Sequence, residues 1–140
     1  MKHYDVSVQI DASPERIWAI LSDGPGYTAW DSGVERVEGD IALGRSIKVF
    51  SKMMPGRAFP VTVAEMTPHA RMVWSGGMPL GLFKGVRTFT LAPLPSGQTR
   101  FDMREEFSGP LLPLIWRSMP DLTPSFQQFA AGLKQRAEAA

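Results

Sequence analysis

Two alternating segments joined by a short turn constrain the fold of this chain most strongly. Hydrophobic residues recur at every second position of residues 83–91 and of residues 101–107, on either side of Pro95-Ser96-Gly97. Gly97 suits the left-handed conformation that a three-residue hairpin loop requires. The pattern therefore predicts an antiparallel hairpin that is closed by this loop.

Each of the two segments carries one charge within its hydrophobic face. With Leu94 opposite Gln98, the register places Arg87 directly across from Glu105 and aligns the hydrophobic residues of the two strands. A shift by one residue would turn one hydrophobic face to solvent, so the pattern favours this register. Because charges are costly to bury in a dry core even when paired, an inward ion pair is typical of a region that water or a polar ligand reaches. We therefore predict a cavity on this face.

The composition excludes several classes of protein. The 140 residues, with a formal net charge of +1 and no run of Lys or Arg, favour a single domain (1–140) that does not bind nucleic acid. The absence of cysteine excludes disulfides and thiolate catalysis and fits a reducing compartment. Residues 1–5 lack the apolar core of a signal peptide, and no apolar run is long enough to cross a bilayer. We expect a cytoplasmic protein without integral membrane association.

The rest of the chain reads as one strand, two short helices, a series of strands and a long helix. Ser13 as N-cap before Pro14 predicts a helix to residue 22, and a second helical turn is expected at 27–31. Alternation predicts antiparallel strands at residues 4–10, 34–38, 45–52, 59–66, 71–75, 83–92 and 98–108.

The last third of the chain has a helical pattern. Residues 111–119 are apolar and are interrupted by Pro113, and Pro120 follows them. Thr123 before Pro124 repeats the arrangement of a cap followed by proline, which predicts a helix start. The hydrophobic residues that recur at helical spacing from there are Leu122, Phe126, Phe129, Leu133 and Ala137. A long C-terminal helix is therefore expected to lie against the sheet.

Local sequences along the whole chain resemble those of one superfamily. The matching segments are residues 8–18 and 27–31 at the start of the chain, 89–93 and 97–100 in the penultimate hairpin, and 105–112 and 126–138 in the last strand and helix. They resemble the START/birch-pollen-allergen (SRPBCC) superfamily and, within it, the polyketide cyclase/dehydrase-like subgroup.

The resemblance implies an α+β helix-grip fold. In this fold a curled antiparallel sheet of about seven strands surrounds a long C-terminal helix, two short helices follow the first strand, and a hydrophobic tunnel lies between sheet and helix. Such proteins bind lipids, sterols, polyketides and other apolar molecules, and some cyclise, dehydrate or hydrolyse their ligand. The superfamily shares no catalytic signature, so no residue of this chain inherits a catalytic role.

The expected ligand contacts come from inward strand positions, the connecting segments and the helix face. They are Trp30, Met53, Phe59, Trp74, Arg87, Phe89, Met103, Glu105, Trp116, Met119 and Phe126. Each of the apolar ones would also serve as core, but aromatic rings and thioethers are typical of apolar ligand sites. Arg87 and Glu105 are either a structural ion pair or polar anchors for a ligand carbonyl, carboxylate or hydroxyl.

Three functions remain open at this stage. The first is binding of an apolar or amphipathic small molecule by a monomer or homodimer. The second is a cyclase or dehydratase without metal or cofactor, in which Glu105 is the general base, Arg87 stabilises an enolate oxygen and Tyr27 is a candidate proton donor. The third is a protein-interaction module of the same fold.

Two further features complete these expectations. His3 and His69 are expected on the surface, and two separated histidines without cysteine predict no metal site. The glycine-rich loop 76–82 carries three apolar residues, and it is expected either to cover a tunnel mouth or to pack on the terminal helix.

Overall fold

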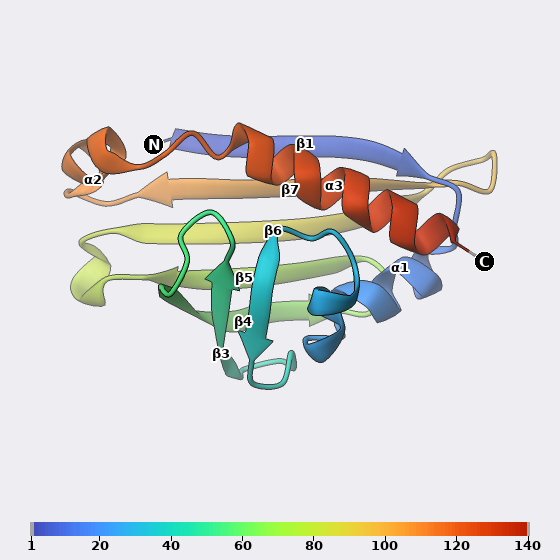
Figure 1. Ribbon diagram of the computed structural model, residues 1–140, viewed down its shortest axis with the longest axis horizontal. Helices are drawn as coiled ribbons and strands as arrows, with labels where there is room; N and C mark the ends of the chain where they lie inside the picture. The colour runs from blue at the N-terminus through green and yellow to red at the C-terminus, as the bar shows by residue number, and fades with distance from the viewer. Residues whose placement is uncertain (1, 140) are drawn as a thin grey trace.

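Seven antiparallel strands form one curled sheet in the order β1-β7-β6-β5-β4-β3-β2 (Figure 1). The computed structural model describes residues 2–139. The strands are β1 (Lys2–Ile10), β2 (Val34–Glu38), β3 (Ser46–Ser51), β4 (Ala58–Thr67), β5 (Arg71–Gly77), β6 (Lys84–Pro93) and β7 (Thr99–Ser108). Every neighbouring pair is antiparallel, as the spacing of the strands predicts.

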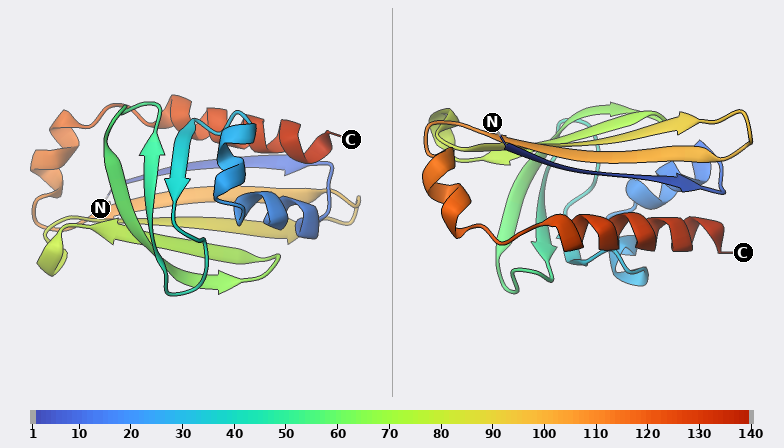
Figure 2. Two further views of the ribbon diagram at one scale, coloured as in Figure 1. Left: turned by 60° about the horizontal axis from the view of Figure 1, so that its bottom comes forward. Right: turned by 90° about the horizontal axis from the view of Figure 1, so that it is seen from above.

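The helices lie at the two ends of the sheet and on its concave side (Figures 1 and 2). They are α1 (Pro14–Leu21), η1 (Pro25–Ala29), η2 (Pro79–Gly81), α2 (Leu112–Ser118) and α3 (Thr123–Glu138). The long α3 packs on β1 and β7, and β2 and β3 curl round toward the same side. This is the helix-grip arrangement that the resemblance implies.

The hairpin of β6 and β7 has the register expected from the sequence. The loop closes through a hydrogen bond of 2.8 Å from Leu94 N to Gln98 O, and Arg87 lies directly opposite Glu105. β1 pairs with the other edge of β7, so this hairpin is flanked by β1 and β5. The predicted ion pair therefore lies inside the sheet and away from its edges.

Side-chain hydrogen bonds fix the N-terminal part of α1. Ser13 Oγ accepts from Arg16 N at 3.2 Å, which confirms the predicted N-cap. The Arg16 side chain then reaches the C-terminal end of α3, where Nε donates to Ala137 O at 2.6 Å and Nη2 to Ala139 O at 2.7 Å. A guanidinium at a helix C-terminus pairs with carbonyls that have no partner within the helix. Arg16 thus joins α1 to α3.

One expectation for the last third of the chain is wrong. Thr123 is not the cap of α3. The N-cap is Leu122, and the Thr123 N–H donates instead to Asp121 Oδ1 at 3.0 Å. That hydrogen bond holds the pKa of Asp121 below its usual value. Pro113 lies in the first turn of α2, where the missing N–H would have no partner in the helix.

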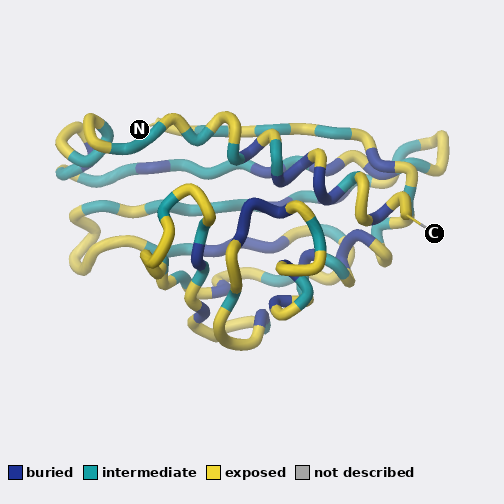
Figure 3. The backbone as a smooth tube through the Cα atoms, in the orientation of Figure 1, coloured by how far each residue is buried: buried dark blue, intermediate teal, exposed yellow. Residues whose placement is uncertain are grey.

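The buried residues fill the space between the sheet and the helices (Figure 3). Phe129 of α3 packs against β6 and β7, with ring-centroid distances of 5.9 Å to Phe89 and 6.2 Å to Phe101. Gly132 allows α3 to approach the chain after η1, since a Cβ there would lie 2.0 Å from Asp31 O. This half of the concave side is therefore closely packed.

Candidate functional site

The inward ion pair lies on the face of the sheet that α3 covers. Arg87 Nε donates to Glu105 Oε1 at 2.6 Å, and 24% and 18% of the two side chains remain exposed. The guanidinium carbon of Arg87 also lies 5.0 Å from the centroid of the Phe126 ring, within the range of a cation–π contact. The pair is therefore covered on one side by α3 and still reached by solvent.

The pair belongs to a row of side chains that runs across four strands. The register places Tyr4 beside Glu105, Glu105 beside Arg87, and Arg87 beside Trp74. Gly85 is the next position of β6 on the same face, and a Cβ there would lie 3.1 Å from Glu105 Oε2. The carboxylate thus lies over a position without a side chain, which leaves it space that a larger residue would fill.

Trp74 provides a hydrogen-bond donor that has no partner within residues 2–139. Its Nε1 atom is buried, while its ring packs 4.9 Å from Phe89 in an edge-to-face contact and 6.3 Å from Tyr27. Directly opposed side chains on one face of a sheet are neighbours, and the register places Trp74 opposite Arg87. A buried donor without an acceptor costs about 1–3 kcal/mol.

The other expected contact residues on the sheet and α3 are buried. Phe89 and Met103 form a directly opposed pair one inward position along from Arg87 and Glu105, and Phe126 of α3 lies against Arg87. Phe126 also packs on Tyr4 at 5.7 Å between ring centroids. These apolar residues surround the ion pair on the side of the α3 interface.

Two of the expected contact residues come from α2 and the residue that follows it. Trp116 is half-buried and stacks on Tyr4, with 5.5 Å between ring centroids, and it lies 5.8 Å from Phe107. Met119 follows α2 and is half-buried. Of the remaining expected contacts, Phe59 is half-buried on β4 and Met53 is exposed in the loop between β3 and β4.

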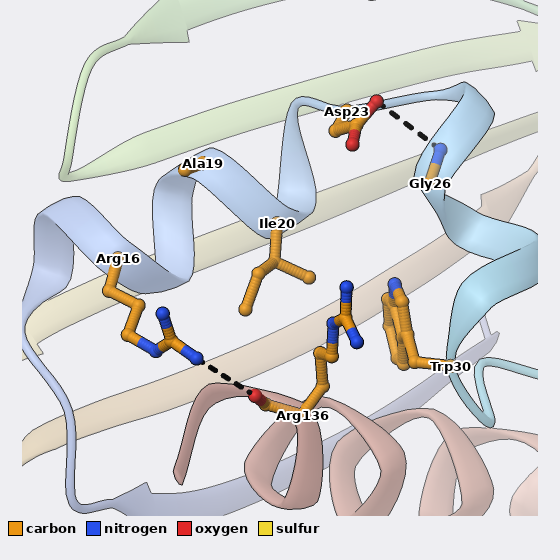
Figure 4. A pocket seen from close by; sticks show the side chains of 7 residues that line it. All are labelled: Arg16, Ala19, Ile20, Asp23, Gly26, Trp30 and Arg136. Atoms are coloured by element: carbon orange, nitrogen blue, oxygen red, sulfur yellow. Dashed lines mark hydrogen bonds between the residues drawn. The ribbon is translucent and has the colours of Figure 1, made fainter. Parts of the chain in front are cut away.

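A pocket of about 350 Å³ opens on the surface between α1, η1 and α3 (Figure 4). The lining residues are Arg16, Ala19, Ile20, Asp23, Gly26, Trp30 and Arg136. Trp30 Nε1 is buried and has no hydrogen-bond partner in the described part of the chain. A second pocket of about 300 Å³ lies beside η2. Neither includes Arg87 or Glu105, so neither is the tunnel that the resemblance implies.

Tyr27 does not have the position expected of a proton donor. It is fully buried, and its hydroxyl donates to Leu21 O at 2.6 Å. Burial raises the pKa of the Tyr27 phenol far above its usual value, although the positive charge of Arg87 acts in the opposite direction. The candidate role of Tyr27 as the acid of a dehydratase is therefore wrong.

The histidines lie on the surface, as expected. His3 is exposed and lies 3.4 Å from Asp5, while His69 occupies a turn with a φ of 67°. Within residues 2–139 there is no group of three or more His, Cys, Asp or Glu side chains that could hold a metal ion. None of the helices in that range is long and apolar enough to cross a membrane.

The comparison with protein families identifies the chain. The family described as polyketide cyclase / dehydrase and lipid transport matches residues 1–138. The chain belongs to this family. The resemblance to the SRPBCC superfamily is thereby confirmed, whereas a search of the curated proteins gave no match.

Solved structures with the same fold include proteins with different descriptions. The Aha1 dimer from Colwellia psychrerythraea has a TM-score of 0.75 at 20% identity, with 99% of this chain and 97% of that chain covered. A START superfamily protein from Mycobacterium smegmatis has a TM-score of 0.69 at 17% identity, with 97% of each chain covered. DynU16, a putative protein in the dynemicin biosynthetic locus, has a TM-score of 0.73 at 16% identity, with 99% of this chain and 48% of that chain covered. At these identities the likeness shows the fold alone.

Sequence reasoning did not find two features of this region. The unpartnered N–H of Trp74 depends on how its ring packs against Tyr27 and Phe89, which no periodicity reveals. The pocket between Arg16 and Arg136 joins residues that are 120 positions apart, and no motif relates them.

Proposed function

We propose that the protein binds an amphipathic small molecule, with the polar end of the ligand at Arg87 and Glu105 and its apolar part against the residues around them. The observation that carries this proposal is the partly exposed ion pair on the α3-covered face of the sheet. Pairs of charges are costly to desolvate, so a partly accessible pair inside an apolar surface fits a site for polar ligand atoms better than it fits core.

The donors beside the pair favour a particular polar group on the ligand. Arg87 uses Nε for Glu105, and a guanidinium has four further N–H groups on its two Nη atoms. Trp74 adds a buried N–H without an acceptor. A ligand carbonyl or carboxylate oxygen would accept from these donors and remove the cost of the unpaired indole. The ligand class is therefore an apolar molecule that carries a carbonyl or carboxylate.

The comparisons are consistent with this proposal. The description of the family includes lipid transport, and a START superfamily protein is among the solved structures of the same fold. The aromatic and methionine side chains next to the pair are of the kind that apolar ligand sites use.

A pair of fluorescent probes tests the proposal. Prodan is a naphthalene dye with a ketone, and the same dye without its propionyl group lacks the acceptor. We expect saturable binding of prodan with one site per chain. Trp74→Phe should raise the prodan Kd about fivefold to tenfold, the value of one hydrogen bond, and leave binding of the ketone-free dye unchanged.

Trp18→Phe is the matched control, because Trp18 is also buried and aromatic but lies in α1 and is not among the buried donors without a partner. It should leave both affinities unchanged. The proposal is wrong if neither dye binds saturably and no apolar ligand in a panel of lipids, sterols and polyketides does so either.

An enzymatic role for Glu105 is the second candidate. Glu105 Oε1 accepts from Arg87 while Oε2 lies over Gly85, so one carboxylate oxygen is not used by the ion pair. A carboxylate in this position is suited to act as a general base, and a neighbouring guanidinium to stabilise an enolate oxygen. Glu105→Gln should abolish any turnover of polyketide-like substrates and retain ligand binding. Unchanged turnover would remove Glu105 from such a mechanism.

A further inference from the structure

Four large hydrophobic side chains are exposed at one end of the sheet, the end at which both η2 and α2 lie (Figures 1 and 2). Met78, Leu80 and Leu82 come from the loop of η2, and Leu114 comes from α2. Leu80 is 97% exposed and Leu114 is 66% exposed. A hydrogen bond of 2.9 Å from Leu111 N to Leu82 O joins the two segments. We call these four side chains the apolar tip.

The backbone of the loop holds Leu80 outward in an uncommon conformation. Leu80 has φ 60° and ψ 21°, in the left-handed region that leucine rarely adopts. Such conformations cost about 1–3 kcal/mol and persist where the surroundings impose them, often at binding sites. The expectation that this loop packs on the terminal helix is not met, since no described residue covers Leu80. The loop thus presents an apolar side chain to solvent.

Three basic residues surround the apolar tip. Lys84 follows η2 and is paired with Ser108, and Lys2 occupies the adjacent end of β1 with its Nζ 5.6 Å from the Trp116 ring. Arg117 is exposed on α2. None of the three basic side chains forms an ion pair within residues 2–139.

Acidic residues are absent from the two segments that contain η2 and α2. Residues 66–101 and 107–120 contain no Asp or Glu. The carboxylates nearest along β7 are Glu105 and Glu106, and they pair with Arg87 and Arg104. The end of the molecule with the protruding leucines therefore carries an excess of positive charge, although the whole chain has a formal charge of only +1.

We propose that the apolar tip docks on the surface of a bilayer that contains anionic lipids. Leucine and methionine side chains that insert at the headgroup boundary, next to Lys and Arg that face anionic headgroups, are the combination that reversible membrane binding uses. A groove on another protein would also accept Leu80, but it gives no reason for three unpaired basic side chains around it. Docking by this end does not depend on the ligand proposed above.

Sedimentation with vesicles tests the docking. Wild-type protein is mixed with vesicles of phosphatidylcholine alone, or of phosphatidylcholine with phosphatidylserine, and the bound fraction is measured. We expect binding to the anionic vesicles that weakens as salt is added. Leu80→Ser/Leu114→Ser should weaken it at least tenfold. Lys84→Glu/Arg117→Glu should weaken vesicle binding by more than about fivefold for each substituted residue. The effect is this large because each change reverses a charge rather than only removing it.

Matched controls come from outside the tip. Leu43 is exposed to about the same degree as Leu114, and Lys48 is exposed on β3, so Leu43→Ser and Lys48→Glu should bind vesicles as wild type does. All changed side chains are exposed, and unchanged thermal unfolding will confirm that each variant is folded.

Three results would overturn the proposal. They are no binding to anionic vesicles, equal binding to both kinds of vesicle, and equal binding by wild type and the tip variants. Self-association without vesicles that Leu80→Ser/Leu114→Ser abolishes would assign the tip to a second copy of the chain instead.

Discussion

The ion pair of Arg87 and Glu105 predicts a specific pattern of stabilities. Arg87→Met leaves the Glu105 carboxylate, which is mostly buried, without its partner. Replacing both charged residues, as in Arg87→Met/Glu105→Leu, removes the stranded charge as well. We therefore expect the double variant to be more stable than Arg87→Met alone.

The exposure of the pair sets the expected magnitude. Breaking a fully buried pair costs about 3–5 kcal/mol, and an exposed pair contributes about 0–1 kcal/mol. Because roughly a fifth of each side chain is exposed, we place the cost of Arg87→Met between these limits, at about 2 kcal/mol. That cost includes loss of the contact with the Phe126 ring, about 0.5–1 kcal/mol. The free energy of unfolding of the double variant should exceed that of Arg87→Met by about 1 kcal/mol or more.

Urea unfolding of the wild type, the two single variants and the double variant at pH 7 gives the coupling free energy. Arg71 and Glu65 form the control, because this ion pair is also on the sheet but its side chains are half exposed. The same substitutions there should show coupling of about 0–1 kcal/mol. The reasoning fails if the effects at Arg87 and Glu105 add to within about 0.3–0.5 kcal/mol, which is the behaviour of independent sites.

Two further changes test the packing around the site. Gly132→Ala would stabilise a free helix by about 1 kcal/mol, but in this protein the new Cβ would lie 2.0 Å from Asp31 O. We therefore expect urea unfolding to show that the variant is less stable than the wild type. A more stable variant would contradict the close approach of α3 to Asp31. Burial raises the pKa of Tyr27, so stability should hold below the unfolded phenol pKa of about 10 and fall as pH rises above it. Tyr27→Phe should lose about 1–3 kcal/mol at neutral pH, since Leu21 O is left unpaired, and should lack this alkaline fall. An alkaline fall of the same size in the variant would contradict the assignment to Tyr27.

The sequence predicts the hairpin and its ion pair because several local signals agree there. The period-two pattern, the loop with Gly97 and the two charges all require the register in which Arg87 faces Glu105, and the structure has that register. The cap at Ser13 is similarly local, since the side chain and its N–H partner are three residues apart. Signals of this kind involve only residues of one helix, one strand or one hairpin, so the sequence displays them directly.

The remaining features depend on tertiary packing, which the sequence does not display. Pro113 is compatible with either a break or a first helical turn, and the surroundings select the latter. Tyr27 is polar enough to suggest a site near solvent, but its hydroxyl finds Leu21 O in the interior. The buried N–H of Trp74 likewise follows from the aromatic rings that enclose it.

The most direct test of ligand binding beside the ion pair is a map of amide and indole chemical shifts in ¹⁵N-labelled protein as prodan is added. The account predicts the largest changes at Trp74, Arg87 and Glu105, together with a downfield shift of the Trp74 indole N–H as it donates to the ketone. Changes confined to the pocket of Trp30 and Arg136, or no changes at saturating dye, would contradict it.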